Sequence, residues 1–183
     1  NSLKKNNLNL FVCGSHLNKN YGNTSKEIKK YIATKIINCK NIIFKNNEID
    51  TPQSSRKLFV EFLKKIKNKN INYLIMLGDR YELLPIANVC LLLGIKIIHI
   101  HGGEVTKGAI DNKIRNSISM IADYHFVATK KSKTNLIKFG IEKKKIFLLG
   151  APGLENINTF LLKKEYLEKK FNFRFYEKNI ILS

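Results

Sequence analysis

Short apolar runs recur at intervals of roughly 20 to 30 residues along the chain, and longer stretches with helical spacing of apolar residues lie between them. A short, almost purely apolar run is typical of a strand that is buried on both faces of a parallel sheet. Strands are therefore predicted at residues 8–12, 42–44, 73–77, 95–100, 125–128 and 146–149.

The intervening stretches predict helices at residues 25–37, 54–67, 81–93, 110–121 and 131–139. Because strands and helices alternate, the chain predicts right-handed βαβ units. The expected fold class is α/β, a Rossmann-like open parallel sheet with helices on both faces. Residues 154–170 predict a loop and a helix, and residues 179–183 predict the start of another strand.

The charge balance is strongly basic, with 33 Lys and Arg against 14 Asp and Glu and a formal net charge of +19. Such a balance ordinarily indicates nucleic-acid binding. Here only four of the basic residues are Arg, and Lys, Asn and Ile make up 76 of the 183 residues, which indicates coding bias. The lysines are also scattered without interleaved aromatic residues, so we expect no nucleic-acid partner.

The sequence shows no apolar run of 18 residues and no signal-peptide pattern, so no membrane association is expected. Cys13, Cys39 and Cys90 are widely spaced and form no C-x-x-C pair. Reduced thiols, no metal site and a cytoplasmic location follow as expectations.

Polar residues and glycines follow four of the predicted strands directly, at residues 14–16, 78–80, 99–104 and 150–153. In an open parallel sheet, ligands bind beyond the carboxyl ends of the strands. Glycine lets a backbone turn sharply or approach a ligand. These loops are therefore the candidate site.

Two interpretations of Asp79 and Arg80 are open. Asp79 can cap the following helix with Arg80 on the surface. Alternatively, Asp79 transfers protons and Arg80 binds a phosphate or carboxylate group. The sequence pattern does not separate these two interpretations.

The segment from His99 to Arg115 has alternatives of its own. His99 and His101 have the spacing of zinc ligands at a strand end, but no third ligand has a fitting position, and His99 also suits a buried core site. Asp111 and Arg115 lie four residues apart at a helix start, which fits a surface ion pair as well as a functional pair. No dinucleotide, P-loop or serine-hydrolase fingerprint is present.

Five motifs in collinear order make the family recognisable. They are Gly14-Ser15-His16-Leu17 with Tyr21-Gly22-Asn23-Thr24, Gly78-Asp79-Arg80-Tyr81-Glu82, His99-Ile100-His101-Gly102-Gly103-Glu104, Gly108-Ala109-Ile110-Asp111 with Arg115, and Ala151-Pro152-Gly153-Leu154-Glu155-Asn156-Ile157. Over residues 8–158 the chain resembles the hydrolysing UDP-N-acetylglucosamine 2-epimerases of the sialic-acid and legionaminic-acid pathways.

The resemblance implies the first half of a GT-B-type fold, in which two Rossmann-like domains face each other across a cleft for the nucleotide sugar. Residues 1–158 would be the N-terminal domain without its first strand. Residues 159–183 would be an inter-domain helix and the start of a second domain that is missing here. The implied partners are a UDP-sugar substrate, that missing C-terminal domain and further copies in a homo-oligomer.

The implied reaction abstracts the proton at C2 of the sugar and eliminates UDP to give a glycal. Water then adds to release UDP and the 2-epimeric sugar, such as N-acetylmannosamine, and no cofactor is required. Proton movement at one carbon needs at least two acid/base groups. By the resemblance, the catalytic candidates are Asp79, His101, Glu104 and Asp111, and the substrate-binding candidates are Arg80, Arg115, His16, Gly102 and Gly103.

His101 departs from part of the family, which has a catalytic glutamate at this position. The sequence therefore leaves open whether His101 or Glu104 takes that role. Asn112 stands where many relatives have a second acid, which leaves Asp111 as the carboxylate there. Two other function classes compete with the epimerase: a GT-B glycosyltransferase domain, and an inactive remnant that binds nucleotide sugar.

Overall fold

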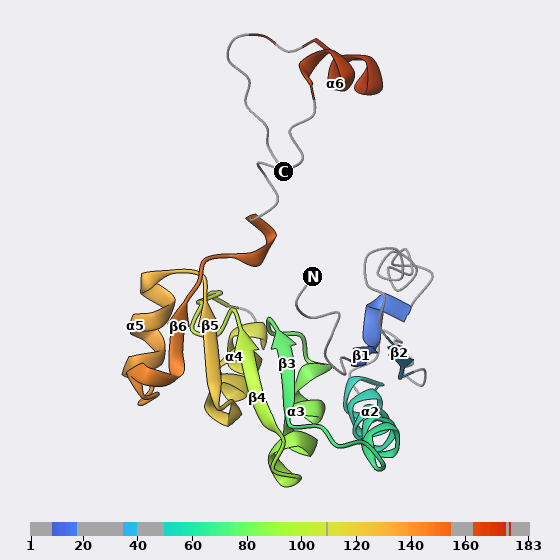
Figure 1. Ribbon diagram of the computed structural model, residues 1–183, viewed down its shortest axis with the longest axis vertical. Helices are drawn as coiled ribbons and strands as arrows, with labels where there is room; N and C mark the ends of the chain where they lie inside the picture. Colours follow the sequence, from blue (N-terminus) through green and yellow to red (C-terminus); the bar gives the residue numbers. More distant parts are fainter. Residues whose placement is uncertain are drawn as a thin grey trace. The chain divides into compact units, whose positions relative to one another are not determined.

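The computed structural model describes residues 9–17, 35–39, 50–108, 110–154, 163–174 and 176 (Figure 1). The chain divides into two compact units, Asn1–Leu149 and Gly150–Ser183. Within the second unit the structure describes a short 3₁₀ turn, η5 (Pro152–Leu154), and one helix, α6 (Lys164–Phe171). The candidate site lies in the first unit.

The first unit contains two parallel sheets. β1 (Asn9–Val12) pairs with β2 (Lys35–Asn38). The second sheet has the order β3-β4-β5-β6 and consists of β3 (Tyr73–Leu77), β4 (Lys96–Ile100), β5 (Tyr124–Val127) and β6 (Ile146–Leu148). All described pairings are parallel, which confirms the predicted α/β class with a parallel sheet.

Helices connect these strands in the order expected for βαβ units. α2 (Asp50–Ile66) precedes β3, α3 (Leu83–Leu92) joins β3 to β4, α4 (Ile110–Ile121) joins β4 to β5, and α5 (Lys130–Lys138) joins β5 to β6. The shorter elements are two 3₁₀ turns, η2 (Gly14–Leu17) after β1 and η4 (Lys143–Lys145) before β6. None of the helices in the described ranges is long and apolar enough to cross a membrane.

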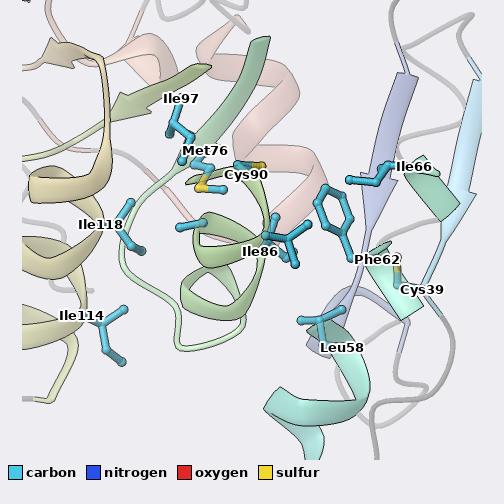
Figure 2. Close-up of a cluster of buried hydrophobic side chains, with 12 residues drawn as sticks. Cys39, Leu58, Phe62, Ile66, Met76, Ile86, Cys90, Ile97, Ile114 and Ile118 are labelled. Atoms are coloured by element: carbon cyan, nitrogen blue, oxygen red, sulfur yellow. The ribbon is translucent and has the colours of Figure 1, made fainter. Parts of the chain in front are cut away.

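α3, α4 and α5 pack against one face of the four-stranded sheet, and α2 packs against α3. The strand register places Met76, His99, His125 and Ile146 in one row across that face, and all four are buried. Figure 2 shows the main apolar cluster, in which side chains of α2, α3 and α4 meet those of β3 and β4. This packing fixes the positions of α3 and α4 relative to the strand ends.

The opposite face of the same sheet is apolar and largely uncovered by the described residues. Tyr73, Ile75 and Leu77 of β3 are each at least half exposed, and Phe147 of β6 is 41% exposed. Parallel sheets are normally covered on both faces. The helix layer on this second face therefore stays a prediction.

Two predictions of local structure differ from the structure. Residues 35–37 were expected to end a helix, but Lys35–Asn38 forms β2, because the β-branched Ile36 and Ile37 fit a ladder with β1 as well as they fit helical spacing. α3 begins at Leu83 instead of residue 81, with Glu82 as its N-cap residue. The strands predicted at 42–44 and 179–183 lie outside the described residues.

Candidate active site

Arg115 is the centre of a buried polar cluster at the carboxyl edge of the sheet. It lies on the inner side of α4 beside Ile114 and is only 6% exposed. Its Nη1 donates to the backbone oxygen of Glu104 at 3.0 Å and to the hydroxyl oxygen of Thr106 at 3.2 Å. Its Nη2 pairs with the carboxylate of Asp79. One guanidinium thus ties α4 to the loops that follow β3 and β4.

The contacts of Arg115 decide two alternatives that the sequence left open. Asp79 is not the cap of α3, because that helix begins at Leu83 and the Asp79 carboxylate pairs with Arg115. Arg115 does not form a surface ion pair with Asp111 either, because its side chain is buried and directed to Asp79. Both residues belong to a built polar cluster and not to the solvated surface.

His101 and Glu104 form a second pair in the loop after β4. The Nδ1 atom of His101 lies 2.7 Å from Oε1 of Glu104. With Glu104 ionised, Nδ1 carries the proton and donates, which leaves Nε2 as the acceptor nitrogen of the ring. His101 also has a φ of 65°, a left-handed conformation that costs a non-glycine residue of order 1–3 kcal/mol and is concentrated at functional sites.

Gly102 and Gly103 are buried, and close packing accounts for both glycines. A Cβ on Gly102 would lie 2.9 Å from Oγ of Ser119 and 3.0 Å from Nδ1 of His99. A Cβ on Gly103, whose φ is 75°, would lie 2.4 Å from the backbone oxygen of Ser132. These contacts hold the loop that carries His101 and Glu104 against α4 and α5, and the substrate-binding role of the two glycines stays a prediction.

His99 lies beneath this loop as a core histidine. Its Nε2 donates to the backbone oxygen of Gly78 at 2.7 Å, and its Nδ1 lies 3.0 Å from Oγ of Ser119. Burial lowers the pKa of His99 below its usual value. Both ring nitrogens are therefore used by the fold. In the described part of the chain, no group of three His, Cys, Asp or Glu residues lies close enough to hold a metal ion.

The other predicted site residues are more open. Arg80 is exposed and its Nε lies 3.5 Å from the Glu82 carboxylate. His16 is exposed in η2, after β1, and Asp111 is exposed in the first turn of α4, where it makes no hydrogen bond or ion pair with the described residues. The structure thus joins Asp79, Glu104 and Arg115 in one network. Arg80, His16 and Asp111 lie outside this network.

Sequence reasoning missed two residues of this region. The hydroxyl oxygen of Thr106 accepts from Arg115, and the backbone N–H of Thr106 donates to Oδ1 of Asn112 at 3.3 Å. Glu82 is a buried acid between the apolar residues of α3 and the Asp79 loop. A lone acid directly before a wholly apolar helix segment is the sequence signal that could have singled out Glu82.

With this geometry in hand, comparison with known proteins decides the family. The whole chain, residues 1–183, matches the family described as UDP-N-acetylglucosamine 2-epimerase. The chain belongs to the UDP-N-acetylglucosamine 2-epimerase family.

Curated members of the 2-epimerase family are clearly similar in sequence. The chain is 38% identical over 166 residues to the GDP/UDP-N,N'-diacetylbacillosamine 2-epimerase (hydrolyzing) of Campylobacter jejuni, covering 88% of this chain and 42% of that protein. It is 35% identical over 156 residues to the UDP-N,N'-diacetylbacillosamine 2-epimerase (hydrolyzing) of Legionella pneumophila, covering 84% of this chain and 40% of that protein. The chain therefore spans about two fifths of the length of these relatives.

Solved structures of 2-epimerases share the fold. The structure of the Methanocaldococcus jannaschii UDP-GlcNAc 2-epimerase in complex with UDP-GlcNAc and UDP matches with a TM-score of 0.74 at 24% identity, over 93% of this chain and 47% of that one. The Neisseria meningitidis UDP-GlcNAc 2-epimerase bound to UDP-GlcNAc matches with a TM-score of 0.68 at 17% identity, over 93% and 48%. The chain thus shares its fold with about half of the length of each of these proteins.

Proposed function

We propose that the protein carrying this chain is a hydrolysing 2-epimerase that converts UDP-N-acetylglucosamine or a related UDP-acetamido sugar to UDP and the 2-epimeric sugar. The observation that carries this proposal is the network around Arg115, which holds Asp79 and the His101–Glu104 loop at one edge of the sheet. The names of the curated relatives support the reaction class.

His101 is the proposed base in this chain. The reaction begins with removal of the proton at C2 of the sugar, and a histidine with a free ring nitrogen can accept it. The 2.7 Å contact from Nδ1 to Glu104 orients the ring and leaves Nε2 for that proton. Glu104 then stabilises the imidazolium that forms, as the aspartate of a Ser-His-Asp triad stabilises its histidine. This assigns the role that the sequence left open between the two residues.

Loss of the C2 proton and cleavage of the bond from C1 to the diphosphate oxygen give the glycal and UDP. Addition of water to the glycal places a hydroxyl at C1 and a proton at C2 on the opposite side. Asp111 is the proposed second acid/base group, since its exposed carboxylate is not committed to another described residue. Asp79 acts through Arg115, because their ion pair keeps the guanidinium fixed.

Arg80, Arg115 and His16 are the proposed contacts for the substrate and its leaving diphosphate. A guanidinium that is already held by a carboxylate needs little reorganisation when negative charge develops, which favours the transition state. No metal, redox cofactor or nucleic acid takes part in this proposal. Gly102 and Gly103 contribute by letting the loop that carries His101 and Glu104 pack closely against α4 and α5.

We also propose a two-domain organisation for the whole protein. Residues 1–158 form the first domain, and residues 159–183 lead to a second domain that completes the cleft for UDP. The protein is proposed to act as a cytoplasmic homo-oligomer, with the free thiols of Cys13, Cys39 and Cys90 supporting a reducing compartment.

The proposal is tested by incubating the full-length protein with UDP-N-acetylglucosamine and, separately, with UDP-N,N'-diacetylbacillosamine. Steady release of UDP with the 2-epimeric sugar, followed by proton NMR, is the expected result. The isolated 183-residue chain should release no UDP at a useful rate, because half a cleft cannot orient the substrate. Transfer of the sugar to an acceptor with retention of configuration at C2 would instead establish a glycosyltransferase.

A further inference from the structure

Glu82 is a buried carboxylate without hydrogen-bond donors in the described structure. It is the N-cap residue of α3 and is 3% exposed. Neither Oε1 nor Oε2 accepts a hydrogen bond from a described residue. An ionised group that is taken out of water without donors destabilises the folded protein. A position with this cost calls for a reason beyond packing.

The side chain of Glu82 reaches the loop that follows β1. A Cβ on Gly14 would lie 2.5 Å from Oε1 of Glu82, and Gly14 itself has a φ of 65°. Gly14 begins η2, which also contains His16. Because β1 and β3 belong to separate sheets, Glu82 is a link between the loop after β1 and the loop after β3.

Glu82 forms an ion pair with Arg80, two residues earlier. The distance from Nε of Arg80 to Oε2 of Glu82 is 3.5 Å, which is an ion pair but too long for the charge-assisted hydrogen bond that forms at about 2.7–2.9 Å. The Arg80 side chain is 57% exposed, whereas that of Glu82 is 4% exposed. A small movement of Arg80 would therefore join its Nε to Glu82 and leave its remaining N–H groups facing outward.

We propose that Glu82 is a positioning residue that holds Arg80, and with it the Gly14–Leu17 loop, for the diphosphate of the nucleotide sugar. This inference rests on the proposed function. When the diphosphate binds, Arg80 closes onto Glu82 and presents its outward N–H groups to the phosphate oxygens. The buried charge lowers stability in the free protein and strengthens anion binding, a trade-off that is common at functional sites.

The test combines thermal melts with UDP titration calorimetry on the full-length protein. Glu82→Gln should melt at the same or a higher temperature, because it removes a buried charge that accepts no hydrogen bond and has only the long 3.5 Å ion pair with Arg80 among the described residues. The same variant should bind UDP about tenfold more weakly, since a charge-assisted contact is lost. Arg80→Gln should give a similar loss, and the double variant should lose no more than either single one. When turnover is measured over a range of UDP-sugar concentrations, kcat should change by a smaller factor than KM.

The matched control is Glu61→Gln. Glu61 is a partly buried glutamate of α2 that pairs with Lys65 at 3.5 Å and has no contact with Arg80 or Glu82 in the described structure. Its replacement should leave UDP affinity unchanged. If UDP affinity depended only on the net charge of the protein, Glu61→Gln and Glu82→Gln would change it equally.

Each other outcome overturns the inference in a recognisable way. A lower melting temperature of Glu82→Gln with unchanged UDP affinity would make Glu82 a purely structural carboxylate. Weaker binding in Arg80→Gln alone, or additive losses in the double variant, would remove Glu82 from the diphosphate site and leave the proposed function standing. No UDP binding by the unsubstituted protein would overturn both.

Discussion

Two arginine–carboxylate ion pairs lie at the carboxyl end of β3, and they differ in burial and in length. We call Arg115–Asp79 the closed pair and Arg80–Glu82 the open pair. Arg115 is buried and bonded to Asp79, Glu104 and Thr106. Arg80 is exposed and lies 3.5 Å from a carboxylate that is itself buried. The closed pair joins three elements and so serves the fold as well as the site. The open pair has unused hydrogen-bonding capacity, which is what a ligand can complete.

The largest expected effect comes from breaking the closed pair. Arg115→Met should destabilise the protein by about 3–5 kcal/mol, because Asp79 is left as an unpaired and partly buried charge. Arg80→Met, the corresponding change in the open pair, should shift stability by less than about 1 kcal/mol, because the Arg80 side chain is 57% exposed and at 3.5 Å offsets little of the cost of burying Glu82. Urea unfolding of the two variants measures both values. Equal losses in the two variants would remove the distinction between a closed and an open pair.

Replacement of Asp111 tests its proposed acid/base role through the turnover rate. Asp111→Asn should lower kcat by about 10²–10⁴-fold, the usual loss when a general acid or base is removed. Its melting temperature should stay unchanged, since the Asp111 carboxylate is exposed and has no partner among the described residues. The opposite behaviour is expected of Asp123→Ala, because Oδ2 of Asp123 accepts a 2.8 Å bond from the Ile97 N–H. Normal turnover in Asp111→Asn would remove Asp111 from the mechanism.

The buried histidines beneath the closed pair predict a loss of stability in acid. Burial, and then the neighbouring His99, lower the pKa of His125 from 6.5 to about 4. The folded state therefore favours neutral His125, so its contribution is fully present above pH 6.5 and is lost as the pH falls from 6.5 towards 4. The expected loss is about 3 kcal/mol at the acid end of this window.

Replacement of His125 measures how much of the stability lost at low pH is due to this residue. Neither ring nitrogen of His125 has a hydrogen-bond partner in the described ranges, so His125→Phe should fold and should show a smaller loss of stability between pH 6.5 and 4. His16→Gln, a change at an exposed histidine, should keep the pH profile of the unsubstituted protein. Parallel profiles for all three proteins would show that His125 does not titrate in this range.

The strands and the edge where the site lies could be predicted from the sequence. β3 is confirmed at Tyr73–Leu77, and α4 is confirmed at Ile110–Ile121, because each has one unambiguous period. β2 was missed, since Lys35-Ile-Ile-Asn38 fits both periods and only the ladder with β1 decides between them. Where local pattern is ambiguous, pairing with a distant strand determines the structure.

The contacts inside the site could not be predicted in the same way. Asp79 and Arg115 are 36 residues apart, so their ion pair depends on how α4 docks beside β3 and not on any spacing in the sequence. The motifs supplied the residue types, but the only partner that spacing suggested for Arg115 was Asp111, four residues earlier. Glu82 was overlooked because an acid at a helix start ordinarily looks like a solvated cap.

The most direct test of the central claim is the reaction of UDP-N-acetylglucosamine with the full-length protein in D₂O. A hydrolysing 2-epimerase removes the C2 proton and later returns one from a group that exchanges with solvent. We predict that the released 2-epimeric sugar carries deuterium at C2, seen as loss of its C2 proton signal in NMR. Release of UDP with the C2 proton fully retained would contradict it.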